Sequence, residues 1–268
     1  MAKIFAIANQ KGGVGKTTTA VNLAASLAAT RKRVLLIDLD PQGNATTGSG
    51  VNKQDLALTV CDVLLNRTPV SEVIVRVETS GFDVLPGNAD LTAAEVGLLN
   101  EIGREKRLSI ALKPVTDNYD FILIDCPPSL SMLTVNGLSA ANGVIIPMQC
   151  EYFALEGMAD LLGTIEGIRE MVNPALEIEG VLRTMYDPRN SLTNDVSAQL
   201  TAHFQDKLYR TCIPRNVRLA EAPSFGLPAL VHDKTSRGAL AYLALAGEVL
   251  RRLEGENSAA PQTESAAG

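Results

Sequence analysis

Short, strongly apolar runs recur along the chain, and longer segments with the spacing of helices lie between them. The runs are rich in Val, Ile and Leu and cover residues 4–8, 34–40, 82–85, 121–125, 143–147 and 180–185. Runs of this length with little polar alternation predict strands buried on both faces of a sheet. The segments between and after them predict helices over residues 19–28, 154–171, 195–204 and 236–253. This alternation favours an α/β fold, a mostly parallel twisted sheet with helices on both faces.

Two segments depart from this alternation of strands and helices. Residues 45–80 are polar at first and then amphipathic, and they predict short helices over 60–65 and 70–75 that Pro69 separates. Residues 91–112 place apolar side chains at helical spacing among many charges, which predicts one surface helix.

Composition supports a single large domain. The chain has 268 residues, of which 46% are hydrophobic and 4% aromatic, so the core must consist mainly of Ala, Val, Leu and Ile. We expect this domain to cover residues 1–253. Residues 254–268 are rich in Ala, Ser and Glu and contain no base, which predicts a disordered acidic and polar tail.

Neither a secretory signal nor an apolar run long enough to span a membrane is found, so we expect a cytoplasmic protein. The four cysteines are widely spaced and form no zinc pattern, which is typical of reduced thiols. They are Cys61, Cys126, Cys150 and Cys212.

The first apolar run leads into a glycine-rich loop and then into a predicted helix. Glycines let backbone N–H groups converge on a phosphate, and a helix N-terminus adds a favourable dipole. Lys16 would reach the β- and γ-phosphates, and the Thr17 hydroxyl would hold Mg²⁺. The loop therefore predicts a P-loop nucleotide site made of Lys11, Gly12, Gly13, Val14, Gly15, Lys16, Thr17 and Thr18.

Acidic residues end two of the predicted strands. Asp38 and Asp40 lie on the same side of the second strand, and Asp125 ends the strand over residues 121–125. Ligands of open α/β sheets bind at the carboxyl ends of the strands, so all three acids should lie beside the P-loop. Asp125 would bind Mg²⁺ through a water molecule, opposite Thr17. The alternative for Asp38 and Asp40 is that one of them only caps the following turn.

The net charge of −6 excludes a uniformly basic nucleic-acid binder. One segment of the chain is nevertheless basic. Residues 207–237 contain six bases and two acids, which leaves the rest of the chain at −10. Such a concentration can bind phosphate backbones without reading sequence. A solvated or internally paired patch is the alternative.

Five motifs together resemble one protein family. They are K-G-G-V-G-K-T-T from Lys11, D-L-D-P-Q-G-N from Asp38, F-I-L-I-D-C-P-P from Phe121, I-P-R-N-V-R-L-A-E-A-P-S from Ile213 and the late S-R-G. The first departs from the ordinary P-loop, since Gln10 stands where a glycine is usual, and it is similar to the deviant Walker A motif of the ParA/MinD ATPases. The whole set is similar to the chromosome-partitioning ParA, or Soj-type, ATPases over residues 3–253.

The resemblance implies roles for individual residues. Lys11 would reach the phosphates of the partner subunit in an ATP-bound sandwich dimer, and Asp40 would position the attacking water. Asp38 would lie near the metal, and Pro214 and Asn216 near the adenine. The positions that match DNA-binding residues are Arg218 and Arg237, with Arg215 beside them.

The resemblance also implies a cycle. The ATP-bound dimer would bind DNA non-specifically on the nucleoid, and a ParB-type partner would stimulate slow ATP hydrolysis to drive segregation of a chromosome or plasmid. The short stretch before the P-loop favours a chromosomal relative. Residues 45–80 would pack near the nucleotide or the dimer interface, and the sequence leaves both open.

Three other functions would each require a feature that can be compared with this sequence. A MinD-like membrane ATPase would end in a basic amphipathic helix, whereas this chain ends in acidic and polar residues. A nitrogenase-iron-protein-like reductase would need two suitably placed cysteines per subunit. A scaffold that binds nucleotide without hydrolysis would not need both Asp40 and Asp125.

Overall fold

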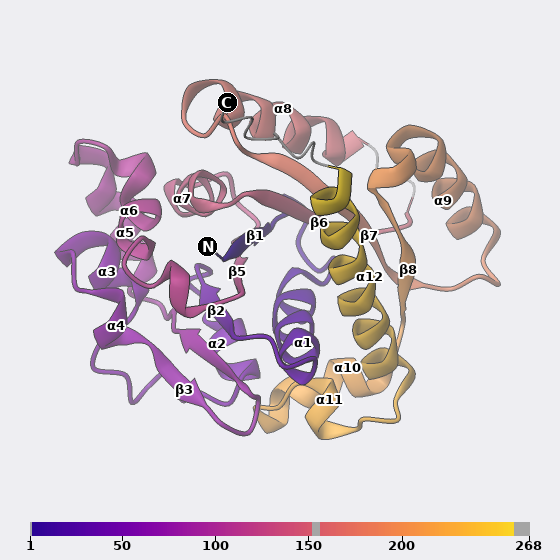
Figure 1. Cartoon of the computed structure of the whole chain (residues 1–268), viewed down its shortest axis with the longest axis horizontal. Helices are drawn as coiled ribbons and strands as arrows, with labels where there is room; N and C mark the ends of the chain where they lie inside the picture. Colours follow the sequence, from indigo (N-terminus) through magenta and orange to yellow (C-terminus); the bar gives the residue numbers. More distant parts are fainter. Residues whose placement is uncertain (1, 152–155, 260–268) are drawn as a thin grey trace, which may run out of the picture.

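The computed structural model describes residues 2–151 and 156–259, which form an α/β fold around one eight-stranded sheet (Figure 1). The strand order is β3-β4-β2-β5-β1-β6-β7-β8. β3 runs antiparallel to β4, and every other neighbouring pair is parallel. The strands are β1 (Lys3–Ile7), β2 (Val34–Asp38), β3 (Val75–Val77), β4 (Phe82–Leu85), β5 (Phe121–Asp125), β6 (Gly143–Gln149), β7 (Glu177–Tyr186) and β8 (Leu208–Pro214). The predicted mostly parallel sheet is confirmed.

Helices cover both faces of the sheet and create two hydrophobic cores. The core on one face lies under α1 (Lys16–Ala29) and α12 (Arg237–Ala259), which pack side by side. The core on the other face lies under α3 (Val60–Asn66), α5 (Leu91–Gly97), α6 (Arg107–Leu112), α7 (Met132–Ala140), α8 (Glu156–Met171) and α9 (Ser191–Phe204). Every residue of β2 and β5 is buried, which explains why their sequences are almost continuously apolar.

Shorter helices complete the structure around the edges. They are α2 (Asn44–Gly48), α4 (Val70–Val73), α10 (Val217–Glu221) and α11 (Ala229–His232). One turn of 3₁₀-helix, Ala222–Phe225, joins α10 to the loop before α11.

The predicted single helix over residues 91–112 is wrong. Leu91, Ala94 and Leu98 are buried on one side, but the chain breaks into α5, two 3₁₀ turns and α6. Gly103 takes a φ of +67°, which a helix cannot accommodate, and the neighbouring Ile102 is 97% exposed. The apolar residues therefore keep helical spacing across a turn, and Gly103 is the residue of the sequence that indicates this turn.

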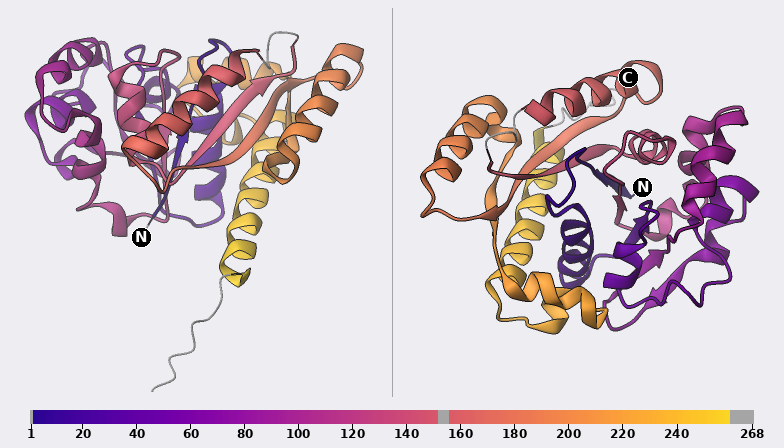
Figure 2. Two further views of the ribbon diagram at one scale, coloured as in Figure 1. Left: turned by 90° about the horizontal axis from the view of Figure 1, so that it is seen from above. Right: turned by 180° about the vertical axis from the view of Figure 1, so that it is seen from behind.

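Several helix ends also differ from the prediction, and two of these differences alter neighbouring elements. The helix expected over residues 70–75 ends at Val73, because Ile74 is extended and Val75 begins the antiparallel edge strand β3. α12 continues past Leu253 to Ala259 and projects beyond the sheet (Figure 2). The first six residues assigned to a disordered tail are thus helical, and residues 260–268 lie outside the described part, as do Ala154 and Leu155 of the predicted helix over 154–171.

Candidate nucleotide site

The glycine-rich loop joins the end of β1 to the start of α1, at the carboxyl edge of the sheet. Gly15 is the N-cap of α1 with a φ of +89°, and Gly13 has a φ of +74°. Residues with a side chain rarely adopt these angles, so the two glycines permit the tight turn. The N-terminus of α1 consequently opens into a pocket, where its free N–H groups can receive an anion.

Lys16 lies inside this pocket rather than on its rim. Its side chain is 7% exposed, and its Nζ donates to the carbonyl oxygen of Lys11 at 3.2 Å. Burial lowers the pKa of Lys16, and the nearby carboxylates of Asp125 and Asp40 counteract part of that effect. A largely desolvated ammonium group with one carbonyl acceptor is ready to bind a phosphate.

Asp125 is the acid that best fits a metal ion. It is fully buried, and neither carboxylate oxygen accepts a hydrogen bond of normal geometry from the described residues, although the Thr17 side chain lies close enough to favour the charged carboxylate. Burial raises its pKa well above the ordinary value, and Asp38 on the adjacent strand raises it further, while Thr17 and Lys16 oppose the shift. Buried carboxylate oxygens without donors usually have a ligand, and Mg²⁺ prefers oxygen.

The protein alone does not form a complete metal cage. Within the described residues, no three His, Cys, Asp or Glu side chains are grouped to hold an ion. Mg²⁺ typically binds through one or two protein oxygens, with phosphates and water supplying the rest. Asp125 and Thr17 therefore fit an ion that arrives with a nucleotide.

Asp38 and Asp40 both have local structural partners. The Oδ2 of Asp38 accepts from the backbone N–H and the hydroxyl of Thr46, each at 2.7 Å, and its Oδ1 accepts from the N–H of Asp40. Asp40 accepts from the N–H of Gln42 at 2.9 Å and also lines the pocket beside Lys16. Burial raises the pKa of Asp38. Asp38 thus anchors α2, whereas Asp40 faces the pocket, and their roles in metal and water binding remain predictions.

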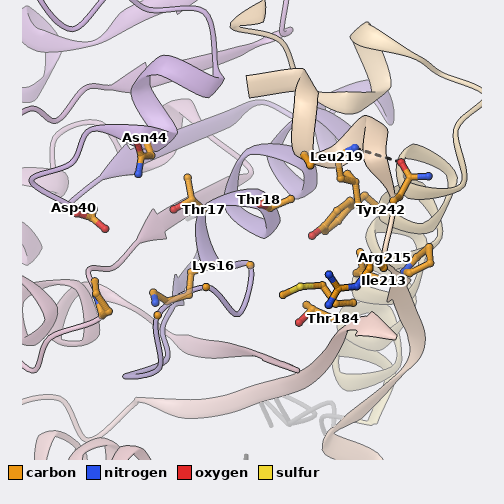
Figure 3. A pocket seen from close by; sticks show the side chains of 18 residues that line it. Lys16, Thr17, Thr18, Asp40, Asn44, Thr184, Ile213, Arg215, Leu219 and Tyr242 are labelled. Carbon is orange, nitrogen blue, oxygen red and sulfur yellow. Dashed lines mark hydrogen bonds between the residues drawn. The ribbon is translucent and has the colours of Figure 1, made fainter. Parts of the chain in front are cut away.

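The pocket has a volume of about 450 Å³ and extends from the P-loop to the C-terminal third of the chain. Figure 3 shows Lys16, Thr17 and Asp40 on one side of it and Ile213, Arg215, Leu219 and Tyr242 on the other. Pro214 and Asn216 belong to this second wall, so the structure brings them to the same pocket as the P-loop. Asn216 also caps α10 by accepting from the N–H of Leu219 (Figure 3).

Sequence reasoning missed several pocket residues that come from distant segments. Thr184 of β7 is 2% exposed and donates its hydroxyl to the carbonyl of Val14 at 2.8 Å. Tyr242 of α12 shares a hydrogen bond with Thr19 of α1 at 3.1 Å. Neither belongs to a local motif, so no signal in the sequence could have identified them.

We expect the Thr184 hydroxyl to stabilise the conformation of the P-loop through its hydrogen bond to Val14. Thr184→Val would leave the Val14 carbonyl without its donor in a buried position, which costs about 1–3 kcal/mol. We expect lower thermal stability and weaker ATP binding, measured by calorimetry. Thr164→Val on α8 is the matched control, because its hydroxyl bonds only within its own helix. Equal effects of the two substitutions would contradict this role.

Lys11 is not among the residues that line the pocket of its own chain. Its Nζ forms an ion pair with Glu151 at 2.8 Å, and both side chains are nearly half exposed. Its backbone N–H is held by the side chain of Asn9. An exposed pair of this kind is weak, so Lys11 is available to another partner.

The three arginines predicted to bind DNA occupy different positions. Arg215 lines the nucleotide pocket. Arg218 of α10 has a half-exposed side chain that pairs with Glu221 and Asp233. Arg237 is exposed at the start of α12, and no carboxylate of the described segments forms an ion pair with it.

The cysteines do not suit an exposed metal–sulfur centre. Cys126 and Cys150 are buried, and burial raises the pKa of both thiols, that of Cys150 to about 11. All four cysteines are free in the structure. This agrees with the expectation of reduced thiols.

Comparison with known proteins finds a matching family and close relatives in sequence. A model of a family described as AAA domain matches residues 2–178. The chromosome partitioning protein ParA of Caulobacter vibrioides is 53% identical over 252 residues, which cover 93% of this chain and 94% of that protein. The sporulation initiation inhibitor protein Soj of Bacillus subtilis is 53% identical over 249 residues, which cover 93% of this chain and 98% of Soj.

Among solved structures, one named cobyrinic acid a,c-diamide synthase from Mycobacterium smegmatis holds an ATP analog and magnesium. It superposes with a TM-score of 0.84 at 38% identity, over 96% of this chain and 97% of that one. In the described part of this chain, no helix is long and apolar enough to cross a membrane. Because the ParA and Soj matches extend over nearly the whole of each sequence, the chain belongs to the ParA/Soj family of chromosome-partitioning P-loop ATPases.

Proposed function

We propose that this protein is an ATP-driven partitioning switch that binds DNA non-specifically as an ATP-bound dimer. The proposal rests mainly on the position of α10. The short helix α10 contributes Leu219 to the wall of the nucleotide pocket (Figure 3), and the adjacent Arg218 has a half-exposed side chain. A nucleotide in the pocket would therefore contact the element that carries a predicted DNA-binding side chain.

The pocket residues support ATP hydrolysis. The N–H groups at the start of α1 and the ammonium group of Lys16 would stabilise charge on the transferred phosphoryl group. Thr17 and Asp125 would hold Mg²⁺, which neutralises phosphate charge, and Asp38 would lie close behind. Asp40, on the pocket wall, would orient the attacking water.

Dimer formation would complete the site. Lys11 would leave Glu151 and reach the phosphates of the second subunit, which adds a positive charge that one chain does not supply to its own site. Hydrolysis would consequently depend on assembly. We assign no arginine finger, so intrinsic turnover should be slow, and a ParB-type protein bound to DNA would accelerate it.

The DNA surface would include Arg218 and Arg237, with Arg215 at the pocket edge. These side chains would contact phosphates rather than bases, so binding should depend strongly on salt and little on sequence. The protein would then be nucleoid-associated within the cytoplasm.

Arg218→Ala should weaken DNA binding in the presence of ATP. Loss of one phosphate contact per subunit should reduce affinity about ten-fold and lower the slope of log affinity against log salt by about 2 per dimer. Fluorescence anisotropy with a short duplex measures both values. The control is Arg169→Ala on α8, an arginine that also pairs with a glutamate one helical turn away.

If the wild type shows no ATP-dependent binding to DNA at low salt, the DNA-binding proposal is overturned. Vesicles containing anionic lipid would then be tested with ATP, since binding to them would support the MinD-like alternative.

A further inference from the structure

Arg218 is already engaged with carboxylates in this structure. Its guanidinium group is hydrogen-bonded to Glu221 Oε1, and its Nε lies 3.3 Å from Asp233 Oδ2. The three side chains together carry a net charge of −1, although one of them is predicted to bind DNA. A phosphate that approaches Arg218 must therefore share or displace these two partners.

Both carboxylates are held in place by further contacts. Glu221 Oε1 also lies 3.0 Å from His232 Nε2. The Oδ1 of Asp233 accepts from the N–H and the hydroxyl of Thr235 at 3.1 and 2.8 Å, which leaves Oδ2 directed at Arg218. Neither acid needs Arg218 to fix its position, so both persist as competitors when the arginine moves.

The surrounding segment is anchored close to the nucleotide. The turn after α10 contacts α2, the helix that Asp38 anchors, and the backbones of Gly50 and Gly226 approach so closely that a Cβ on Gly50 would lie 2.9 Å from the Gly226 carbonyl oxygen. Leu219 and Ala220 of α10 line the nucleotide pocket. Arg218 and Glu221 thus lie on a helix that lines the pocket and leads directly into the turn that contacts α2.

We infer that Glu221 and Asp233 compete with DNA phosphates for Arg218 and thereby limit the DNA affinity of this surface. The inference rests on the proposed DNA-binding function. In this arrangement, the acids keep the patch weakly attractive to DNA, and release of Arg218 from them is part of forming the DNA-bound state. An exposed ion pair is weak enough for phosphate to displace it, so the competition tunes binding rather than blocking it.

The test is DNA affinity of Glu221→Gln with ATP, measured by anisotropy at low and at physiological salt. We expect binding about two- to five-fold tighter than in the wild type, with a smaller gain at high salt. Glu166→Gln is the matched control, because it frees Arg169 from the same kind of pair on α8 and changes the net charge equally.

A double-mutant cycle separates competition from a general charge effect. In an Arg218→Ala background, Glu221→Gln should give less than half of its single-mutant gain. An equal gain in both backgrounds, or an equal gain for Glu166→Gln, would overturn the inference. Weaker binding by Glu221→Gln would also overturn it, since Glu221 would then position Arg218 for DNA. If the wild type binds DNA with ATP but the variants do not behave as expected, the inferred competition is wrong and the proposed function stands. If the wild type does not bind DNA with ATP, the proposed function itself is wrong.

Discussion

Lys16→Ala is expected to abolish ATP hydrolysis, with a loss of about 10²–10³ in kcat or more. The ammonium group is the buried cation of the pocket and lies where the phosphates would bind, so its removal takes away charge stabilisation of the transferred phosphoryl group. Phosphate release under saturating ATP measures the loss. Lys113→Ala, at an exposed lysine just after α6, serves as the control and should keep wild-type turnover.

Lys16→Ala should keep its fold, because Lys16 makes one hydrogen bond to a backbone carbonyl and no ion pair within the described part of the chain. Circular dichroism checks this. A folded variant that still hydrolyses ATP within a few-fold of the wild type would contradict the proposed mechanism.

Asp125→Asn is expected to inactivate the enzyme and, without magnesium, to stabilise the protein. The buried carboxylate destabilises the folded state when it is charged, because desolvation outweighs the opposing effects of Thr17 and Lys16, and the amide removes that charge at nearly constant shape. We therefore expect the unfolding free energy of the variant to be higher than that of the wild type at neutral pH. Activity with Mg²⁺ should fall at least about 100-fold.

The pH dependence gives a second test of Asp125. Its folded-state pKa is raised by burial, so its contribution to stability is fully present below the unfolded pKa of about 3.9 and is lost as pH rises through the folded value. The difference in unfolding free energy between Asp125→Asn and the wild type should therefore grow from acid to neutral pH. Asp206→Asn, an exposed control, should show no such trend. A constant difference, or destabilisation by Asp125→Asn, would contradict this account.

The sequence was most informative where chemistry is local. The P-loop and the acids at the ends of β2 and β5 are each contiguous in the chain, and parallel strands bring their ends together by topology alone. The buried strands are recognisable because both faces are covered and the runs lack polar residues. The edge strand β3 lacks this signal, since Arg76 is exposed and only Val77 is buried.

What the sequence could not predict depends on side chains that meet across long separations. The pair of Lys11 and Glu151 joins positions 140 residues apart, and Thr184 reaches Val14 across 170. The partners of Arg218 are close in sequence, yet the same spacing fits an arginine free in solvent equally well. Net charge over residues 207–237 therefore could not distinguish a free basic patch from an internally paired one, and the structure pairs its central arginine with two acids.

The most direct test of the central claim is sedimentation velocity of the wild type with a short DNA duplex and Mg²⁺, in ATP, in ADP and without nucleotide. The account predicts a dimer that sediments with the DNA only in ATP, and a free monomer in the other two conditions. The same sedimentation and the same DNA binding in all three conditions would contradict an ATP-controlled, DNA-binding switch.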